Sequence, residues 1–176
     1  MKVYGRRFNL YLALMMGVAI VVGCQTNKKK EKMGTVRIHL QANPNETNST
    51  QVVSVVRSAP VPITISFNPV LTEANLLAAR VLDTPGGFAI QLKFDESGTL
   101  MLEQYSASNP GRHFVIFGQW GESPGDFRWL AAPLITRRLS KGELTFTADI
   151  TRKEADEWVL RLNNVATKIH KGMFKT

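Results

Sequence analysis

Residues 109–120 read Asn-Pro-Gly-Arg-His-Phe-Val-Ile-Phe-Gly-Gln-Trp, a turn signal followed by a nearly continuous apolar run. Adjacent proline and glycine favour a turn, so Asn109-Pro110-Gly111 ends whatever element precedes it. The run from His113 to Trp120 has the length of a strand and lacks the alternation of a strand with one face in water. It therefore predicts a central strand that is covered on both faces.

Further strands are predicted on either side of this run. Thr35–Ala42 alternates between apolar and polar side chains, which is the period of a half-buried strand. Five other runs are β-branched or alternating and have strand length: residues 51–57, 61–67, 88–94, 128–132 and 143–148. The first two of these are close enough in the chain to pair as an antiparallel meander.

Helices are predicted at three places. Thr72 offers an N-cap for a helix through Leu82, and Asp95 offers one for a helix through Ser106. Thr151 and Glu154 match a capping box and open the strongest helical pattern in the chain. The apolar stripe of that helix is Ala155, Val159, Leu162 and Val165, and its solvent-facing residues are Arg152, Glu157 and Arg161. We therefore expect an α+β fold, one mixed or antiparallel sheet with about three helices packed on it.

The first residues have the pattern of a lipoprotein signal peptide. Three basic residues precede an uncharged apolar run at 10–22, which is too short for a comfortable membrane span. The sequence Val21-Val22-Gly23-Cys24 resembles the bacterial lipobox. It predicts a signal peptide over 1–23, cleavage between Gly23 and Cys24, and lipidation of Cys24, the only cysteine in the chain. The alternative is a short uncleaved anchor in which the cysteine is incidental.

Lipidation at Cys24 implies a cell-envelope protein that faces the periplasm and is anchored in the lipid bilayer by its acyl chains. Gln25 follows the cysteine, where aspartate often signals inner-membrane retention, so the outer membrane is favoured. Residues 24–33 form a polar tether that carries four lysines. This tether either lies along anionic headgroups or acts as a soluble spacer.

The net charge of +8 does not belong to the folded part. Three bases lie in the signal peptide and a net three in the tether, which leaves 15 bases and 13 acids from residue 33 onward. A nucleic-acid-binding protein presents clustered basic side chains on its folded surface, and no such cluster occurs here. We therefore expect no nucleic-acid partner.

The order of motifs resembles the periplasmic head domain of SecD. The resemblance rests on Leu71–Asn75, residues 109–116, Ala132–Ile135 and Thr151–Leu162, and it places Glu154-Ala155 at the Glu-Ala pair of the family's closing helix. It implies a SecD-head-like domain over 69–167, preceded by N-terminal strands over 34–68 and followed by a basic, frayed tail over 168–176.

The chain also departs from that family. SecD carries six membrane helices and works with SecF and the translocon by proton flow, whereas this sequence shows no such helices. Glu73 stands where the family has glycine after Leu-Thr. The resemblance therefore implies a fold and a surface for exported polypeptides or Sec components, and it does not imply proton-driven pulling.

Two groups of residues are candidates for binding a partner. Trp120, Phe127 and Trp129 bracket a glycine-rich loop and can form an aromatic patch, although core packing explains them more simply. Arg137 and Arg138 lie at a turn between strands, where they are either solvated or face an acidic partner; solvation is the simpler explanation.

No pattern indicates catalysis, a metal or a cofactor. His39, His113 and His170 lack metal-ligand spacing and are expected at the surface or at strand edges. No Gly-x-Ser-x-Gly elbow occurs, and the glycine loops lack the Lys-Ser/Thr of a phosphate cradle. We therefore expect a non-catalytic binding or accessory lipoprotein linked to export. The alternatives are a structural or assembly lipoprotein of the envelope with no export role and, with less support, a hydrolase.

Overall fold

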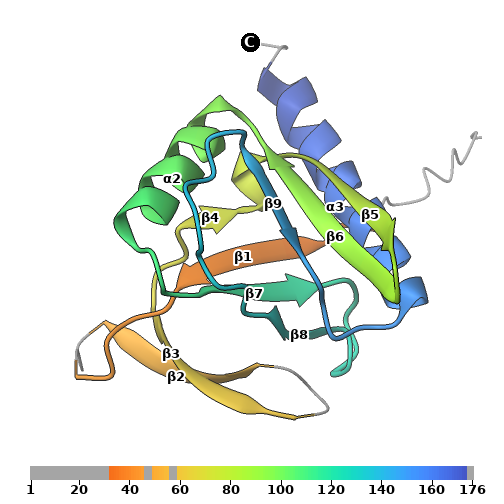
Figure 1. Ribbon diagram of the computed structural model, residues 1–176. Coiled ribbons are helices and arrows are strands. Elements are labelled where there is room, and N and C mark those ends of the chain that lie inside the picture. Colours follow the sequence, from red (N-terminus) through yellow and green to blue (C-terminus); the bar gives the residue numbers. More distant parts are fainter. Residues whose placement is uncertain (1–31, 46–48, 56–58, 174–176) are drawn as a thin grey trace, which may run out of the picture. The chain divides into compact units, whose positions relative to one another are not determined.

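The computed structural model describes residues 32–45, 49–55 and 59–173 (Figure 1). The predicted signal peptide, Gly23, Cys24 and most of the predicted tether lie outside these residues. The described chain forms three antiparallel sheets, two α-helices and one 3-10 turn.

The apolar run at residues 113–120 is a central strand, as its composition predicts. Strand β7 (Phe114–Gln119) lies between β1 (Thr35–Leu40) and β8 (Phe127–Ala131), and β4 (Leu71–Thr72) completes the four-stranded sheet in the order β4-β1-β7-β8. Phe114, Val115 and Ile116 are consecutive and all buried, so both faces of β7 are covered.

The described chain has two further sheets, most of whose strands lie between those of the four-stranded sheet in the sequence. The three-stranded sheet has the order β5-β6-β9, with β5 (Leu76–Thr84), β6 (Gly87–Phe94) and β9 (Glu143–Phe146). Strands β2 (Thr50–Val55) and β3 (Val61–Ser66) form a separate hairpin, the meander predicted from their sequence. This hairpin packs on Val115 and Trp129 through Val55 and Ile65.

The two long helices begin at the caps that the sequence predicts. The Asp95 carboxylate accepts a hydrogen bond from Gly98 N–H at 2.7 Å before α2 (Glu96–Ser108). Thr151 and Glu154 form the capping box of α3 (Arg152–Met173), where Thr151 N–H donates to the Glu154 carboxylate at 2.7 Å. Helix α3 continues through residues 168–173, where we expect a frayed tail. No helix of the described segments is both long and apolar enough to cross a membrane.

The helix predicted over residues 72–82 is wrong. Thr72 does cap a helical turn, but that turn is the 3-10 helix η1 (Glu73–Asn75), and strand β5 follows at Leu76. A register shift between Leu76 and Ala78 changes which side chains face the core. The buried residues Leu76 and Ala79 therefore stand three apart, a spacing that imitates a helix.

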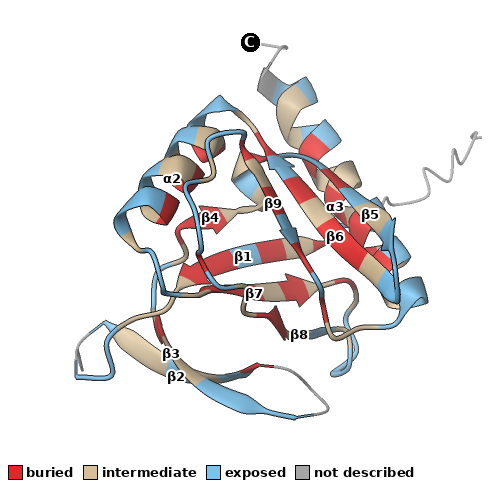
Figure 2. Ribbon diagram, in the orientation of Figure 1, coloured by how far each residue is buried: buried red, intermediate tan, exposed pale blue. Residues whose placement is uncertain are grey.

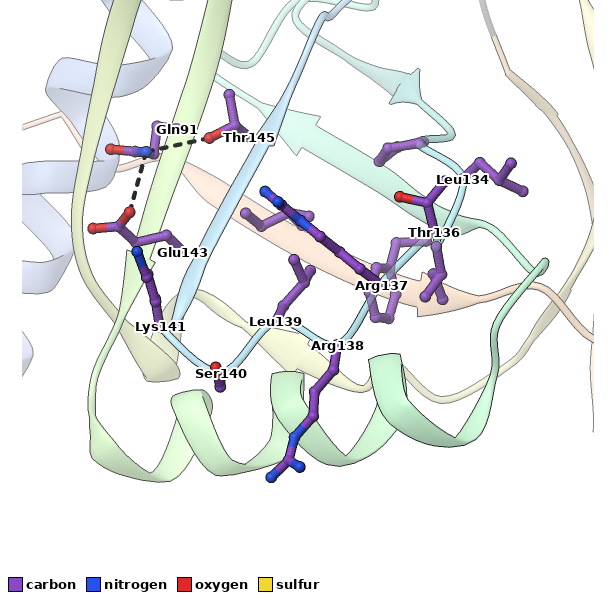
Figure 3. A pocket seen from close by; sticks show the side chains of 14 residues that line it. Gln91, Leu134, Thr136, Arg137, Arg138, Leu139, Ser140, Lys141, Glu143 and Thr145 are labelled. Carbon is purple, nitrogen blue, oxygen red and sulfur yellow. Dashed lines mark hydrogen bonds between the residues drawn. The ribbon is translucent and has the colours of Figure 1, made fainter.

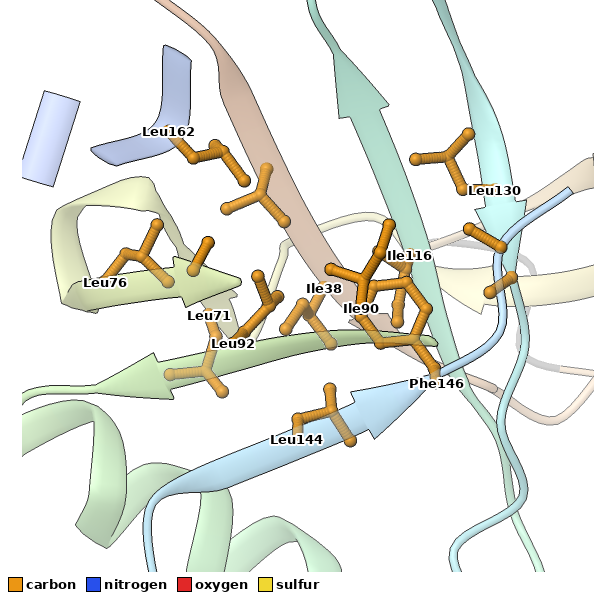
Figure 4. Close-up of a cluster of buried hydrophobic side chains, with 14 of the residues drawn as sticks. Ile38, Leu71, Leu76, Ile90, Leu92, Ile116, Leu130, Leu144, Phe146 and Leu162 are labelled. Carbon is orange, nitrogen blue, oxygen red and sulfur yellow. The ribbon is translucent and has the colours of Figure 1, made fainter. Parts of the chain in front are cut away.

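The α+β class is confirmed, while the single expected sheet is divided into three. Most of the core lies where the four-stranded sheet, the three-stranded sheet and α3 face one another (Figures 2 and 4). Strand β1, which the sequence assigns to a preceding N-terminal segment, lies inside this core with Val36 and Ile38 fully buried.

Trp158 joins α3 to the four-stranded sheet. Its ring is fully buried and its indole N–H donates to the Thr35 carbonyl at 3.0 Å. A Cβ atom on Gly118 of β7 would lie 2.7 Å from the Trp158 ring and 2.4 Å from Leu130, so glycine is required there for the close approach. Arg161 of the same helix, which we expected in water, is mostly buried beside Glu157.

Candidate functional site

A cleft of about 470 Å³ lies beside strand β9 (Figure 3). That volume falls in the range of ligand sites, about 300–1,000 Å³. One wall is β9 together with Gln91 of β6, and the other is the segment Pro133–Lys141 that leads into β9. Phe114 and Leu144 line it as well, and both belong to the core.

Strand β9 is the last strand of its sheet, and its backbone on the cleft side is open. Phe94 N–H donates to the Gly142 carbonyl at 2.9 Å, and the register places Leu92 opposite Leu144. In an antiparallel pair, hydrogen-bonded and non-bonded positions alternate. Leu144 and Phe146 therefore bond to β6, whereas the amides and carbonyls of Glu143 and Thr145 point away from it. Within the described segments, these outward amides and carbonyls form no hydrogen bond to backbone or side chains.

The opposite edge of the same sheet is closed. By the same alternation, the N–H and C=O of Ala79 in β5 point away from β6. Asn163 of α3 binds both groups: its side-chain oxygen accepts from Ala79 N–H at 2.8 Å, and its amide donates to the Ala79 carbonyl at 2.9 Å. The sheet therefore has one edge clamped by a helix and one edge facing a cleft.

The outer wall of the cleft is held at both of its ends. Ile135 N–H donates to the Arg112 carbonyl at 2.8 Å, and its carbonyl accepts from Gly111 N–H at 2.9 Å. At the other end, Leu139 N–H donates to the buried Ser106 hydroxyl of α2 at 2.8 Å. The cleft therefore keeps its width because its wall is tied to two different elements.

Neighbouring arginines in this wall have different environments. Arg138 forms an ion pair with Glu103 of α2, and Figure 3 shows its side chain pointing out along that helix. Arg137 reaches instead across the cleft toward β9. In the described part of the chain, the side chains of Arg137 and Lys141 have no hydrogen bond or ion pair. Glu143 is the acid among the lining residues, and its carboxylate accepts from Gln91 at 3.4 Å, so positive charge is in excess.

The predicted aromatic patch does not assemble. Trp120 is only 2% exposed, and its ring lies 5.0 Å below the guanidinium of Arg128. Trp129 is half-buried under the β2–β3 hairpin, edge-on to His39 and Phe117. Phe127 alone of the three is exposed, at 44%. None of these three aromatics lines the cleft.

The histidines are each tied to backbone or to a side-chain amide. His39 is buried, not at the surface as expected, and its Nδ1 donates to the Ser66 carbonyl at 2.8 Å. His113 contacts the Gln41 amide oxygen at 2.8 Å, and His170 contacts the Leu76 carbonyl at 3.1 Å. In the segments that the structure describes, no three His, Cys, Asp or Glu side chains are close enough to hold a metal ion.

Comparison with solved structures identifies the fold. A crystal structure of SecDF in a super-membrane-facing form matches with a TM-score of 0.52 and 18% identity, over 76% of this chain and 19% of that one. A second structure, of a membrane component SecDF that enhances protein export, has the same TM-score and identity and is covered over 63% of its length. No protein-family model and no curated protein sequence matches the chain.

The protein therefore has a SecD-like α+β fold. It spans about a fifth of one SecDF chain and less than two thirds of the other. The match covers more of this chain than the motifs at residues 69–166, which agrees with the position of β1 inside the core.

The sequence indicates the two arginines but not the strand edge beside them. It predicts a strand over residues 143–148, but an open edge depends on which strands pair over long distances. The local signal is weak: a strand of four residues after Gly142, which adopts the left-handed φ of +65°. Short strands of this kind are common at the edges of sheets.

Proposed function

We propose that this protein is a lipid-anchored accessory module of the cell envelope that faces the periplasm and binds exported polypeptides or a Sec component without catalysis. The single observation that carries the proposal is the cleft beside the open edge of β9, in a fold shared with a membrane component that enhances protein export. Backbone groups at such an edge suit an unfolded chain, because every extended polypeptide presents matching amides and carbonyls.

The proposed lack of catalysis rests on the chemistry of the cleft. Its titratable side chains are arginine, lysine and a glutamate that is bonded to an amide. No histidine, cysteine or aspartate is among the residues that line it. Binding by charge and by backbone hydrogen bonds needs none of those groups.

Photo-crosslinking in cells tests the proposed partner. A crosslinking amino acid replaces Thr136 in the cleft wall or, as a matched control, the exposed Leu160 on the outside of α3. We expect exported polypeptides or Sec components in the products from position 136 and not from position 160. Equal products from the two positions, or none containing those partners, would contradict the proposal. Normal secretion with a weakened envelope in a deletion strain would instead indicate a structural role.

The proposed anchor needs a separate test, because Cys24 lies outside the described residues. A palmitate analogue should label the wild-type chain and not the Cys24→Ser variant. Label that persists in the variant would exclude Cys24 as the lipidated residue. Membrane fractionation of the wild type then distinguishes the outer membrane, which Gln25 favours, from the inner.

A further inference from the structure

We propose that β9 binds its partner by strand addition: an extended polypeptide segment pairs with the edge of β9, and an acidic side chain of that segment meets Arg137. This inference rests on the proposed function and specifies how the cleft recognises its ligand. It concerns one class of partner, an extended segment that carries aspartate or glutamate.

The backbone of β9 provides the pairing surface. The outward amides and carbonyls of Glu143 and Thr145 are two donors and two acceptors at the spacing of one strand edge. At about 3.3 Å per residue, the four residues of β9 match an added segment of four to five residues. The side chains of Leu144 and Phe146 stay in the core, so the added strand has no need to displace them.

The cleft leaves room for such a segment along the whole edge. A second hollow of about 450 Å³ continues past the end of β9, between Leu130–Pro133 and Phe146–Asp149. Pro133 lines both hollows, so they adjoin. Leu134 in the outer wall is 51% exposed and gives apolar side chains of the ligand a surface to cover.

Strand β9 is short, as protected edges often are, but it lacks several other protections that proteins place on free edges. Natural edges are covered by another element, interrupted by proline or a bulge, or carry an inward-pointing charge. In this sheet the β5 edge is covered by Asn163 of α3. Strand β9 contains no proline, pairs with β6 without a register shift, and directs Leu144 and Phe146 inward.

The charge of the cleft selects an acidic segment. Arg137 reaches over the cleft without an ion pair, and Lys141 likewise has none among the described residues. Arg138, one residue away, is already neutralised by Glu103. A carboxylate of the ligand therefore gains a charge-assisted hydrogen bond from Arg137, which forms no ion pair with any described acidic residue of the chain.

Peptide binding to the full-length chain, purified from membranes in detergent, tests the inference. The probe is a capped eight-residue peptide of alternating serine and valine with a central aspartate, measured by fluorescence anisotropy. The matched peptides carry lysine at the same position, or N-methyl groups on all central amides. We expect the aspartate peptide to bind at least tenfold more tightly than either one.

The two neighbouring arginines provide matched variants. Arg137→Ala should weaken binding of the aspartate peptide about five- to tenfold, and Arg138→Ala should change it less than twofold. Thr145→Pro removes one outward N–H group and keeps the hydrogen bonds to β6. It should therefore weaken the binding of every peptide that pairs with β9 by strand addition. Thermal unfolding confirms that each variant is folded; if Thr145→Pro is not, the N-methylated peptide alone decides whether the backbone is used.

Several results would overturn the inference. They are equal affinity for the N-methylated and parent peptides, equal affinity for the aspartate and lysine peptides, or equal effects of the two arginine variants. Self-association of the chain that Thr145→Pro abolishes would assign the edge to a second copy. Binding to phosphatidylglycerol vesicles that requires Arg137, with no peptide binding, would assign the cleft to lipid.

The crosslinking experiment separates this inference from the proposed function. Exported polypeptides crosslinked at position 136, together with peptides that bind regardless of N-methylation, would leave the function standing and reject strand addition. The opposite outcome is that the probe peptide binds by strand addition but no exported polypeptide or Sec component is crosslinked in cells. That outcome would reject the export role and support the binding mode.

Discussion

His39 is a titratable residue enclosed between the β2–β3 hairpin and the four-stranded sheet. Burial lowers the pKa of its imidazole below 6.5; the hydrogen bond to the Ser66 carbonyl opposes this, and the charge of Arg37 adds to the lowering. The unfolded chain therefore binds a proton on His39 more readily than the folded chain. Its contribution to stability is present above pH 6.5 and is lost as the pH falls from 6.5 through the folded pKa.

We expect acidification from pH 7.5 to 5.5 to destabilise the wild type more than His39→Gln. The difference in slope is at most about 1.4 kcal/mol per pH unit, the limit for one group. Urea unfolding of both chains at the two pH values measures it. Parallel loss of stability in the two chains would show that His39 does not bind its proton differently in the folded and unfolded states.

The position of His39 also shows what alternation in a sequence can and cannot predict. The alternation in Thr35–Ala42 correctly separates Val36 and Ile38 from His39. It does not reveal that the β2–β3 hairpin, which contains Ser66, and the half-buried Trp129 of β8 cover the second face. The alternation predicts an exposed His39 because the elements that cover it are distant in the sequence.

At the scale of elements, helix α3 stabilises the β5 edge through Asn163. Replacing Asn163 with alanine leaves the buried N–H and C=O of Ala79 without partners. An unsatisfied buried group costs about 1–3 kcal/mol, so we expect the free energy of unfolding to fall by about 2 kcal/mol or more.

Asn164→Ala is the matched control for this prediction. It makes the same change in helix propensity one residue away, but it removes only the exposed hydrogen bond to the Lys32 carbonyl. We expect it to cost less than about 1 kcal/mol. Equal losses for the two variants in denaturant unfolding would show that the Ala79 clamp contributes nothing beyond an ordinary surface bond.

The elements that sequence predicted well are those with local signals. Asp95 and Thr151 begin their helices because a side-chain oxygen a few residues away satisfies the first amides. The sequence of Leu76–Thr84 wrongly predicts a helix for two reasons. Its leucines and alanines favour a helix, and the bulge places the buried Leu76 and Ala79 three residues apart, as in a helix. Pairing with β6 overrides that local preference, and such pairing is not visible in a short window of sequence.

At the scale of the whole molecule, the site follows from topology more than from composition. Arg137 and Arg138 stood out in the sequence as a pair, yet only the fold shows that one faces a cleft and the other faces Glu103. The open edge of β9 arises because β6 has two neighbours and β9 has one. Neither the different surroundings of the two arginines nor the open edge can be seen in a short stretch of sequence. The sequence therefore indicates candidate side chains but not the cleft in which Arg137 lies.

The distribution of charge separates two proposed attachments, one to membrane and one to polypeptide. A net six of the eight positive charges precede residue 33, beside the proposed lipid site, while the cleft relies on Arg137 in a domain of net charge +2.

Cys24→Ser should therefore leave the membrane fraction and still bind the aspartate peptide. Arg137→Ala should stay with membranes and bind that peptide five- to tenfold more weakly. Fractionation and peptide anisotropy on the same preparations measure both. Loss of membrane association in Arg137→Ala would mean that the cleft itself faces the lipid surface, because a permanent acyl anchor does not depend on one charge of the folded domain.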